Sequence, residues 1–319
     1  MPELPEVETI RRQLAPHLER RTIVRAVIDD PRFTRPVAPS EVEAGLAGAT
    51  IERLGRRGKY LIWSFTDDRH LLVHLRMTGA LLYVESPRDP AAAPVGVAAE
   101  VTAGAATGAA APAPLHVRAR FELDDGHHVL YVDPRRFGTA QLIDGTPARD
   151  AYLDQRLGIE PLTPEFTVEH LRALARGVRA PVKAFVLDQR RIAGVGNIYA
   201  DEALHRAGIH PLRPAGRLTT AQLAALRDSI EDALSAGIEA KGATIDDFRH
   251  IDGATGSFQD LFLVHRREGE PCPNCGTLIR KMVVGGRGTY VCEHCQRRPR
   301  RVQPVAASAD RAAKPPSAA

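Results

Sequence analysis

The sequence has no long apolar run and no cysteine outside one short C-terminal segment. None of the apolar runs among its 319 residues approaches the roughly eighteen residues of a membrane span. The acidic N-terminus also lacks the layout of a secretory signal, a positively charged segment followed by an apolar one. We therefore expect a cytoplasmic protein that does not associate with membranes. Hydrophobic residues make up 44% of the chain, enough for buried cores in about two domains and a small appendage.

The four cysteines lie so close together that a disulfide framework spanning the protein is not expected. They form two C-x₂-C pairs with sixteen residues between the pairs. This spacing is typical of a Cys₄ zinc ribbon, in which four thiolates complete a tetrahedral shell and leave no open coordination position. We predict one structural Zn²⁺, and four unligated cysteines are the less favoured alternative. The predicted ligands are Cys272, Cys275, Cys292 and Cys295.

The chain also has little net charge, only +4, but this charge is unevenly distributed. Residues 264–301 contain nine Lys or Arg and three acids, a local charge of +6. A basic segment of this density indicates a polyanionic partner. A solvated charged surface would explain the charge equally well.

One helix and a series of strands are expected in the first half of the chain. Val7, Ile10, Leu14 and Leu18 recur at helical spacing. Short apolar runs separated by turn residues then indicate strands, and the clearest hairpin turns at Asp125-Gly126. We therefore expect an antiparallel sandwich or barrel. The predicted strands are Thr22–Ile28, Thr50–Leu54, Tyr60–Phe65, Leu71–Leu75, Ala80–Val84 and the hairpin of residues 117–131.

Two segments are expected to be disordered. Residues 86–114 include 12 Ala, five Pro and three Gly, which bury too little apolar surface to offset the entropy of ordering the chain. The tail, residues 302–319, is expected to behave in the same way.

From about residue 164 the apolar period becomes helical. Helices are predicted over 166–176, 180–189 and 197–207, and a longer one begins at Thr219, where Thr219 and Gln222 form a capping-box pattern. The Gly194-Val195-Gly196-Asn197 turn joins two of them. Its glycines permit a close backbone approach, and the following helix start can hold a phosphate, although a purely structural junction is favoured on this motif alone.

The first nine residues contain the strongest candidate for chemistry. If Met1 is removed, Pro2 exposes a secondary amine with an expected pKa of roughly 7.7 to 8.0, which can attack a sugar C1′ and form an iminium ion. Glu3 beside it can move the protons that this step requires. The structural alternative is that prolines and acids open a helix, and on these residues alone it is favoured.

Several separated motifs together resemble one family, the bacterial formamidopyrimidine-DNA glycosylases, over nearly the whole chain outside 86–114 and the tail. The motifs, in the family's order, are residues 2–9 (PELPEVET), 59–61 (KYL), 74–79 (HLRMTG), 133–138 (DPRRFG), 194–200 (GVGNIYA) and 269–272 (GEPC).

The resemblance implies an α+β multidomain fold. Its parts are an N-terminal antiparallel β-sandwich domain with an N-terminal helix (1–146), a hinge (147–163), a helix–two-turn–helix DNA-binding domain (164–262) and a zinc ribbon (263–301).

The implied activity is that of a bifunctional DNA glycosylase and abasic-site lyase of base excision repair. Such an enzyme flips an oxidised purine, 8-oxoguanine or a formamidopyrimidine, out of the duplex. Pro2 then attacks C1′ with Glu3 as acid and base, and Glu6 matches a second carboxylate needed nearby. Lys59 matches the residue assigned to β-elimination, and Arg287 the ribbon arginine that assists δ-elimination and grips phosphate.

The resemblance also implies contacts with damaged double-stranded DNA, bound by a monomer. A wedge of side chains fills the hole that the flipped base leaves, and other residues hold phosphates without reading sequence. A basic family position aligns with Val178, so its role passes to the neighbouring Arg179. The implied contacts are Met77, Arg135 and Phe137 at the wedge, and His116, Asn197, Lys183 and Arg179 elsewhere on the DNA.

Two departures from the family pattern concern specificity and DNA contact. Residues 264–267 read Val-His-Arg-Arg where Val-Tyr-Gly-Arg is common, and Asp246 stands in the loop over the damaged purine where some relatives have a basic residue. Two alternatives remain: an endonuclease VIII-type glycosylase for oxidised pyrimidines, whose usual opening is Pro-Glu-Gly-Pro-Glu, and a non-catalytic zinc-ribbon DNA-binding protein.

Overall fold

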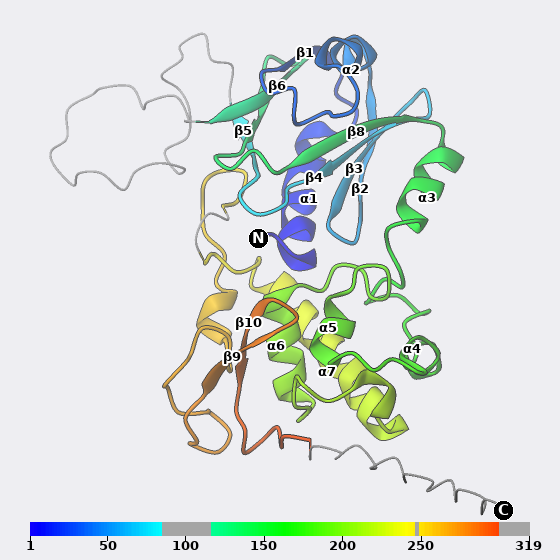
Figure 1. Ribbon diagram of the computed structural model, residues 1–319. Coiled ribbons are helices and arrows are strands. Elements are labelled where there is room, and N and C mark those ends of the chain that lie inside the picture. The colour runs from blue at the N-terminus through cyan, green and yellow to red at the C-terminus, as the bar shows by residue number, and fades with distance from the viewer. Residues whose placement is uncertain (85–115, 246–248, 300–319) are drawn as a thin grey trace, which may run out of the picture.

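The computed structural model describes residues 1–84, 116–245 and 249–299, which form two lobes with the N-terminus between them (Figure 1). The segments expected to be disordered, 86–114 and 302–319, and Asp246 lie outside the described residues, so those expectations stay predictions. Within the described ranges, no helix is both long enough and apolar enough to span a membrane.

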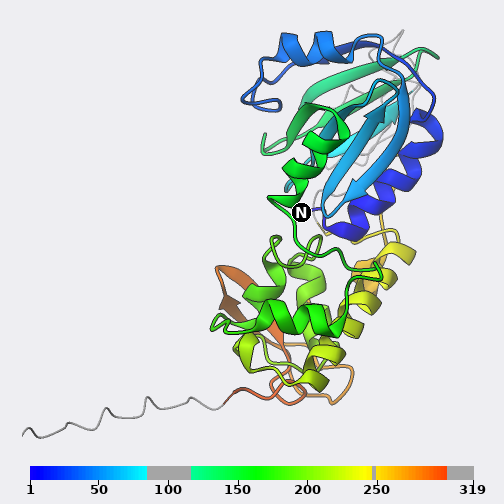
Figure 2. The ribbon, with the colours of Figure 1, turned by 90° about the vertical axis from the view of Figure 1, so that its right-hand side faces the viewer.

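The upper lobe is the predicted antiparallel sandwich (Figure 2). Its two four-stranded sheets have the orders β1-β6-β7-β5 and β2-β3-β4-β8. Trp63 and Phe121 meet across the sheets with ring centroids 5.2 Å apart, and the apolar stripe of the N-terminal helix α1 (Leu4–Leu18) joins the same core. The strands are β1 (Ile23–Ile28), β2 (Ile51–Arg57), β3 (Tyr60–Phe65), β4 (Arg69–His74), β5 (Ala80–Val84), β6 (Val117–Leu123), β7 (His128–Val132) and β8 (Thr139–Asp144).

The lower lobe is helical, as its apolar period predicts. Its long helix α7 (Thr220–Glu239) begins with the predicted capping box, in which the Gln222 amide donates to the Thr219 hydroxyl at 3.2 Å and the Thr219 amide donates to the Gln222 side chain at 3.1 Å. The other helices are α4 (Val168–Ala175), α5 (Val182–Leu187) and α6 (Asn197–Arg206), with short 3₁₀ turns at Ala215–Arg217 and Phe258–Leu261.

Two helices and one strand were not expected from the sequence. Helix α2 (Pro39–Leu46) buries only Val42 and Leu46, and β8 fully buries only Ala140. Helix α3 (Thr146–Asp154) lies in the predicted hinge and packs Leu153 into a small cluster under the upper lobe. Part of the connection between the lobes is therefore a packed helix.

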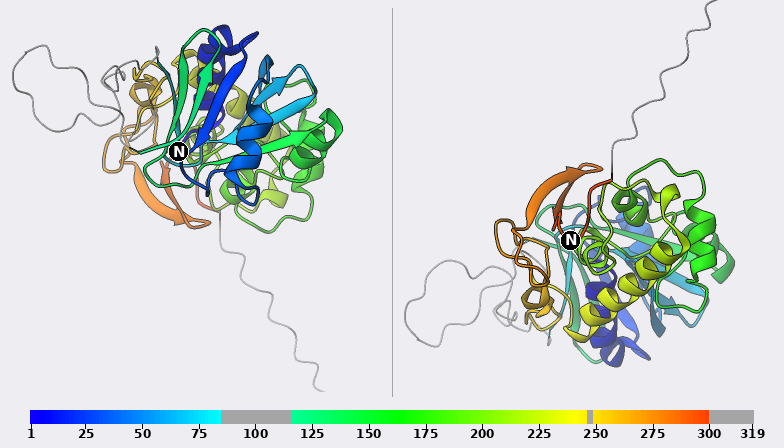
Figure 3. Two further views of the ribbon diagram at one scale, coloured as in Figure 1. Left: turned by 90° about the horizontal axis from the view of Figure 1, so that it is seen from above. Right: turned by 90° about the horizontal axis from the view of Figure 1, so that it is seen from below.

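The zinc ribbon lies at one side of the lower lobe (Figure 3). Strands β9 (Arg280–Val284) and β10 (Arg287–Val291) pair antiparallel, and the turn between them contains Gly285 and Gly286 at φ 58° and 74°. Two consecutive positive φ angles match the strand twist of a two-residue hairpin, and glycine adopts them without steric cost.

Candidate active site

The first turn of α1 lies directly against the Gly194–Asn197 turn of the lower lobe. The Leu4 amide donates to the Gly194 carbonyl at 3.0 Å. A Cβ on Gly194 would come within 2.6 Å of the Leu4 side chain, and one on Gly196 within 2.2 Å of the Glu3 carboxyl carbon. Both glycines are therefore needed for the close approach of the N-terminal segment.

The Glu3 carboxylate occupies the N-terminal end of α6. It accepts hydrogen bonds from the amides of Ile198 at 3.0 Å and Tyr199 at 3.4 Å. Free amides and the positive end of the helix dipole favour an anion at this position. The sequence suggested a phosphate there, whereas the structure places one of the protein's own carboxylates, which is thereby fixed in orientation.

Glu6 is a second buried carboxyl group beside the first. It accepts from the Tyr199 hydroxyl at 2.7 Å and from the amides of Ala243 at 2.8 Å and Glu3 at 2.8 Å. Burial, followed by the nearby Glu3 charge, raises the pKa of Glu6. A carboxyl group with a raised pKa retains its proton to higher pH, so this pair can hold and transfer a proton beside Pro2.

A pocket of about 490 Å³ lies where the two lobes and the ribbon meet. Met1, Glu3, Lys59 and Arg287 all line it, although they come from the N-terminus, the β2–β3 turn and the ribbon hairpin. Lys59 is only 5% exposed, and its pKa is lowered, mainly by burial. A lower pKa makes the neutral amine more available as a base near neutral pH.

Two residues of the pocket, His74 and Arg76, received no role from the sequence. The His74 Nδ1 accepts from the Arg76 amide at 3.0 Å. Burial, followed by the charges of Arg76 and Lys59, lowers the pKa of His74 to about 3, so its ring is neutral at pH 7. Both lie in the HLRMTG motif, but the motif alone gives no sign that they face the same pocket as Lys59.

The predicted wedge residues lie together on the upper lobe and are exposed. Met77 is 37% and Phe137 49% exposed, so neither serves as core packing, and the Arg135 guanidinium lies 4.9 Å from the Phe137 ring centroid. Their loops are held by the fully buried Asp133. It accepts from the Thr78 hydroxyl, the Tyr131 hydroxyl (3.0 Å) and the amides of Arg135 (3.1 Å), Phe137 (2.8 Å) and Gly138 (2.8 Å).

His116 lies at the base of the same loop. Its backbone carbonyl accepts from the Asp133 amide at 3.1 Å, and its side chain is exposed. The exposed His116 side chain is therefore free of the core, and its contact with DNA stays a prediction.

The ribbon hairpin that carries Arg287 is held by the lower lobe. The Gly288 carbonyl accepts from the Asn197 side-chain amide (Nδ2) at 3.0 Å and from the Lys183 ammonium at 3.0 Å. Arg287 itself is exposed and lines the pocket.

Lys183 differs from its expected role as a DNA contact. Its side chain is fully buried, and its three N–H donors reach Gly288, Asp201 at 2.7 Å and the Thr289 hydroxyl at 2.8 Å. The His265 Nδ1 donates to the other Asp201 oxygen at 2.9 Å. The contact between Lys183 and a phosphate is therefore not available in this structure, and Lys183 instead joins the helical lobe to the ribbon.

The four cysteine sulfurs lie within 4.8 Å of one another, with Cys275 and Cys292 3.5 Å apart and Cys272 and Cys295 3.9 Å apart. Four sulfurs around one Zn²⁺ at about 2.3 Å have tetrahedral edges of roughly 3.8 Å. These residues therefore fit one structural zinc.

Arg179 is the one predicted DNA-contact residue that lies in another pocket, at the far end of α6.

A proton-handling pocket of this kind between two lobes suits a DNA glycosylase that also cleaves the DNA backbone. The comparisons with known proteins place the chain in this class. Residues 1–140 match the formamidopyrimidine-DNA glycosylase N-terminal domain, residues 157–249 its H2TH domain, and residues 269–298 the zinc finger found in FPG and IleRS.

Similar proteins span almost the whole chain. The formamidopyrimidine-DNA glycosylases of Chloroflexus aggregans and Syntrophotalea carbinolica are 44% and 42% identical, each over 93% of this chain and 98% and 100% of their own. A Lactococcus lactis Fpg in complex with abasic-site DNA is similar with a TM-score of 0.79 and 31% identity, covering 93% of this chain and all of its own. The Thermus thermophilus MutM (Fpg) protein is similar with a TM-score of 0.75 and 37% identity, covering 92% of this chain and 98% of its own. The chain belongs to the formamidopyrimidine-DNA glycosylase family.

Proposed function

We propose that the protein excises oxidised purines from duplex DNA and then cleaves the sugar–phosphate backbone, with the Pro2 nitrogen as nucleophile. The observation that carries this proposal is the single pocket shared by Met1, Glu3, Lys59 and Arg287. Pro2 is buried and follows Met1, which lines the pocket. Removal of Met1 would therefore present the Pro2 nitrogen to the pocket.

The first step is base excision. Attack of the Pro2 nitrogen on C1′ expels the base with the electron pair of the glycosidic bond, and opening of the sugar ring gives an iminium ion. Glu3 accepts the proton that the nitrogen loses and returns one to the ring oxygen. The α6 amides hold this carboxylate in place, and Glu6 can supply a second proton because its pKa is raised.

The later steps break the backbone. Neutral Lys59 takes a proton from C2′, and the C3′–O bond breaks with departure of phosphate, which is β-elimination. Loss of a C4′ proton and breakage of the C5′–O bond complete δ-elimination. Arg287 stabilises the departing phosphate by charge and hydrogen bonding. The product is a one-nucleotide gap in DNA bound by a monomer, and we place the protein with the nucleoid in the cytoplasm.

Borohydride trapping on a duplex with 8-oxoguanine opposite cytosine tests the proposal. Reduction should link the sugar covalently to Pro2, and a variant that retains an N-terminal extension should give no adduct. Peptide mass analysis that placed the sugar on a lysine, with Pro2 unmodified, would overturn the assigned nucleophile.

The choice of base distinguishes the remaining alternatives. Activity on oxidised pyrimidines with none on 8-oxoguanine would favour the endonuclease VIII-type function. Binding of damaged DNA with neither incision nor trapping would favour a non-catalytic DNA-binding protein.

A further inference from the structure

A second pocket, larger than the catalytic one, lies at the opposite end of α6. The catalytic pocket includes Asn197 at the start of this helix, whereas the second pocket is lined by residues that follow its last residue. Ten residues of α-helix separate the two positions by about 15 Å. In Figure 1 the last described residues, at the red end of the colour scale, lie at the bottom of the lower lobe, away from the N-terminus, and Pro299 among them lines this pocket.

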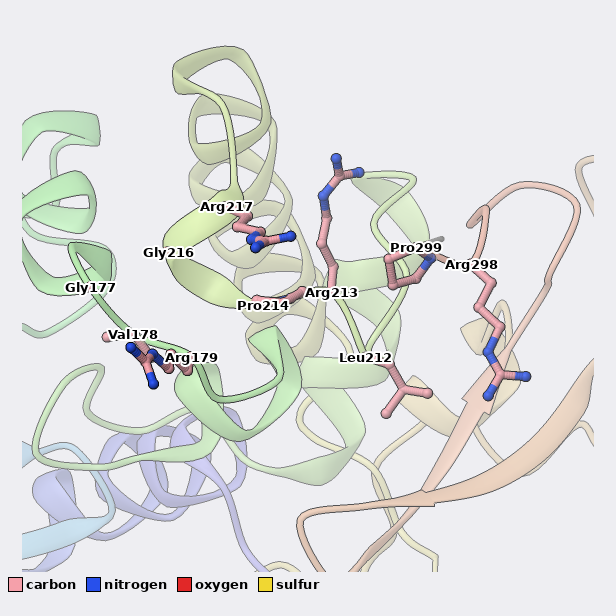
Figure 4. Close-up of a pocket in the computed structure, with 10 residues that line it drawn as sticks. All are labelled: Gly177, Val178, Arg179, Leu212, Arg213, Pro214, Gly216, Arg217, Arg298 and Pro299. Carbon is pink, nitrogen blue, oxygen red and sulfur yellow. The ribbon is translucent and has the colours of Figure 1, made fainter. Parts of the chain in front are cut away.

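The second pocket has a volume of about 830 Å³ and is lined by four arginines from three separate segments. In the view of Figure 4, Arg217 and Arg213 lie between Arg179 on one side and Arg298 on the other. Arg179 comes from the α4–α5 connection, Arg213 and Arg217 from the α6–α7 connection, and Arg298 from the end of the ribbon. None of the ten residues that line the pocket is acidic.

These four guanidinium groups make no hydrogen bond or ion pair within the described part of the chain. Arginines elsewhere behave differently: Arg136 pairs with Asp30, Arg56 with Glu8 and Arg120 with Asp29. An anion that enters the pocket would meet these four guanidinium groups, which have no ion-pair partner in the described part of the chain. Guanidinium groups bind phosphate in a bidentate manner, which suits them to a phosphate ligand.

Exposed arginines also lie next to these segments in the sequence: Arg172 and Arg176 precede Arg179, and Arg297 precedes Arg298. Four arginines around a pocket of about 830 Å³ fit several phosphates of a polyanion better than one small anion. We propose that this pocket binds the phosphate backbone of a second DNA segment, separate from the damaged duplex between the lobes.

Binding of labelled undamaged duplex of about one helical turn, roughly 10 bp, tests this site. The wild-type protein, saturated with an unlabelled short duplex that contains an abasic-site analogue, should still bind one labelled duplex at low salt. The variant R213Q/R217Q/R298Q should weaken this second binding by about tenfold or more and reduce its salt dependence by up to about 0.9 in log–log slope for each phosphate that the variant no longer neutralises. Its incision of a short damaged duplex should stay within about twofold of wild type, because the catalytic pocket is untouched.

The matched control is R25Q/R32Q/R35Q, which removes the same charge from exposed positions of the upper lobe. It should leave the second binding unchanged. Equal weakening by both variants would mean that only net charge matters and would overturn the site. Saturation of the wild-type protein at one duplex per chain, counting labelled and unlabelled duplex together, would also overturn the second site.

Two further outcomes would reject the second DNA segment in favour of another occupant. If the arginine variant lost affinity only for a longer duplex, and the wild-type protein bound one duplex per chain, the pocket would hold the flank of the damaged duplex. Loss of affinity for polyglutamate but not for DNA would indicate an acidic protein partner. Incision is measured separately, so failure of the proposed catalytic function and failure of this site give different results.

Discussion

Arg135 and Arg287, the two arginines predicted to act on DNA, are presented by loops held in opposite ways. The upper loop (residues 133–138) presents Arg135 and is held by a buried anion, Asp133, which accepts the loop's amides. The ribbon hairpin (residues 284–288) presents Arg287 and is held by a buried cation, Lys183, which donates to its Gly288 carbonyl. The upper loop carries its own anchor, whereas the anchor of the hairpin lies 105 positions away in another domain.

This difference predicts different consequences of damage. Loss of Asp133 should loosen one loop of the upper lobe. Loss of Lys183 should weaken the attachment of the ribbon hairpin to the helical lobe, where Asn197 would still bind Gly288, and also leave Asp201 buried without its cation. The following predictions are ordered by their expected effect on the free energy of unfolding.

K183M should have the largest effect. Removing one partner of a buried ion pair costs about 3–5 kcal/mol because the remaining charge stays buried. Denaturant unfolding measures this cost, and the ratio of δ- to β-elimination products should fall because Arg287 is no longer held. The control is K281M, which removes an exposed lysine from strand β9 of the ribbon. If K183M and K281M unfolded alike and gave the same product ratio, Lys183 would not anchor the hairpin.

D133N should cost less, about 2–3 kcal/mol, because an amide has one acceptor oxygen and cannot satisfy the same amides and hydroxyls. Incision should fall with it, since Arg135 and Phe137 lose their fixed positions. The exposed Asp154 provides the control D154N, expected to lie within about 0.5 kcal/mol of wild type. A D133N protein as stable as D154N would contradict the role of Asp133 as the anchor of the upper loop.

Acid should affect the upper lobe through His74. Its folded-state pKa is about 3 and its ordinary value 6.5, so below pH 6.5 the unfolded chain binds a proton that the folded protein does not. Stability should therefore fall by about 2 kcal/mol between pH 6.5 and 5, and further toward pH 3. The free energy of unfolding of H74N should change with pH by that much less over this range. Parallel pH profiles for the two proteins would refute a neutral buried His74.

F137A should have the smallest effect on stability, within about 0.5 kcal/mol, because the ring is exposed. Incision should nevertheless fall roughly tenfold, which corresponds to about 1.4 kcal/mol of the few kcal/mol that unstacking costs. V283A is the control, since Val283 is 72% exposed on the ribbon. Equal incision by both variants would remove Phe137 from the wedge.

The sequence predicted the features whose cause is local. The apolar stripe of α1, the capping box of α7 and the Cys₄ spacing each lie within one short segment, and the structure has all three. The DPRRFG motif, residues 133–138, likewise contains both the anchor Asp133 and the residues that it presents within one short segment.

The features that the sequence missed depend on distant partners or on weak patterns. Nothing near Lys183 indicates that its ammonium is enclosed by Asp201 and the ribbon, so its burial could not be predicted. Nothing near Gly196 indicates that Glu3, rather than a phosphate, takes the amides of α6. Helix α2 and strand β8 bury too few side chains to give a clear period.

The docking of Leu4 against Gly194 means that the first turn of α1 is packed into the helical lobe, although its sequence places it at the start of the sandwich domain. Leu4 packs in the helical core, and Glu3 and Glu6 take their partners from α6, Tyr199 and Ala243. The rest of α1 packs in the core of the sandwich, which also carries Lys59, so this one helix belongs to both lobes. A fragment limited to residues 1–140 would contain Pro2, Glu3 and Lys59 without the helical surface that holds the two carboxyl groups.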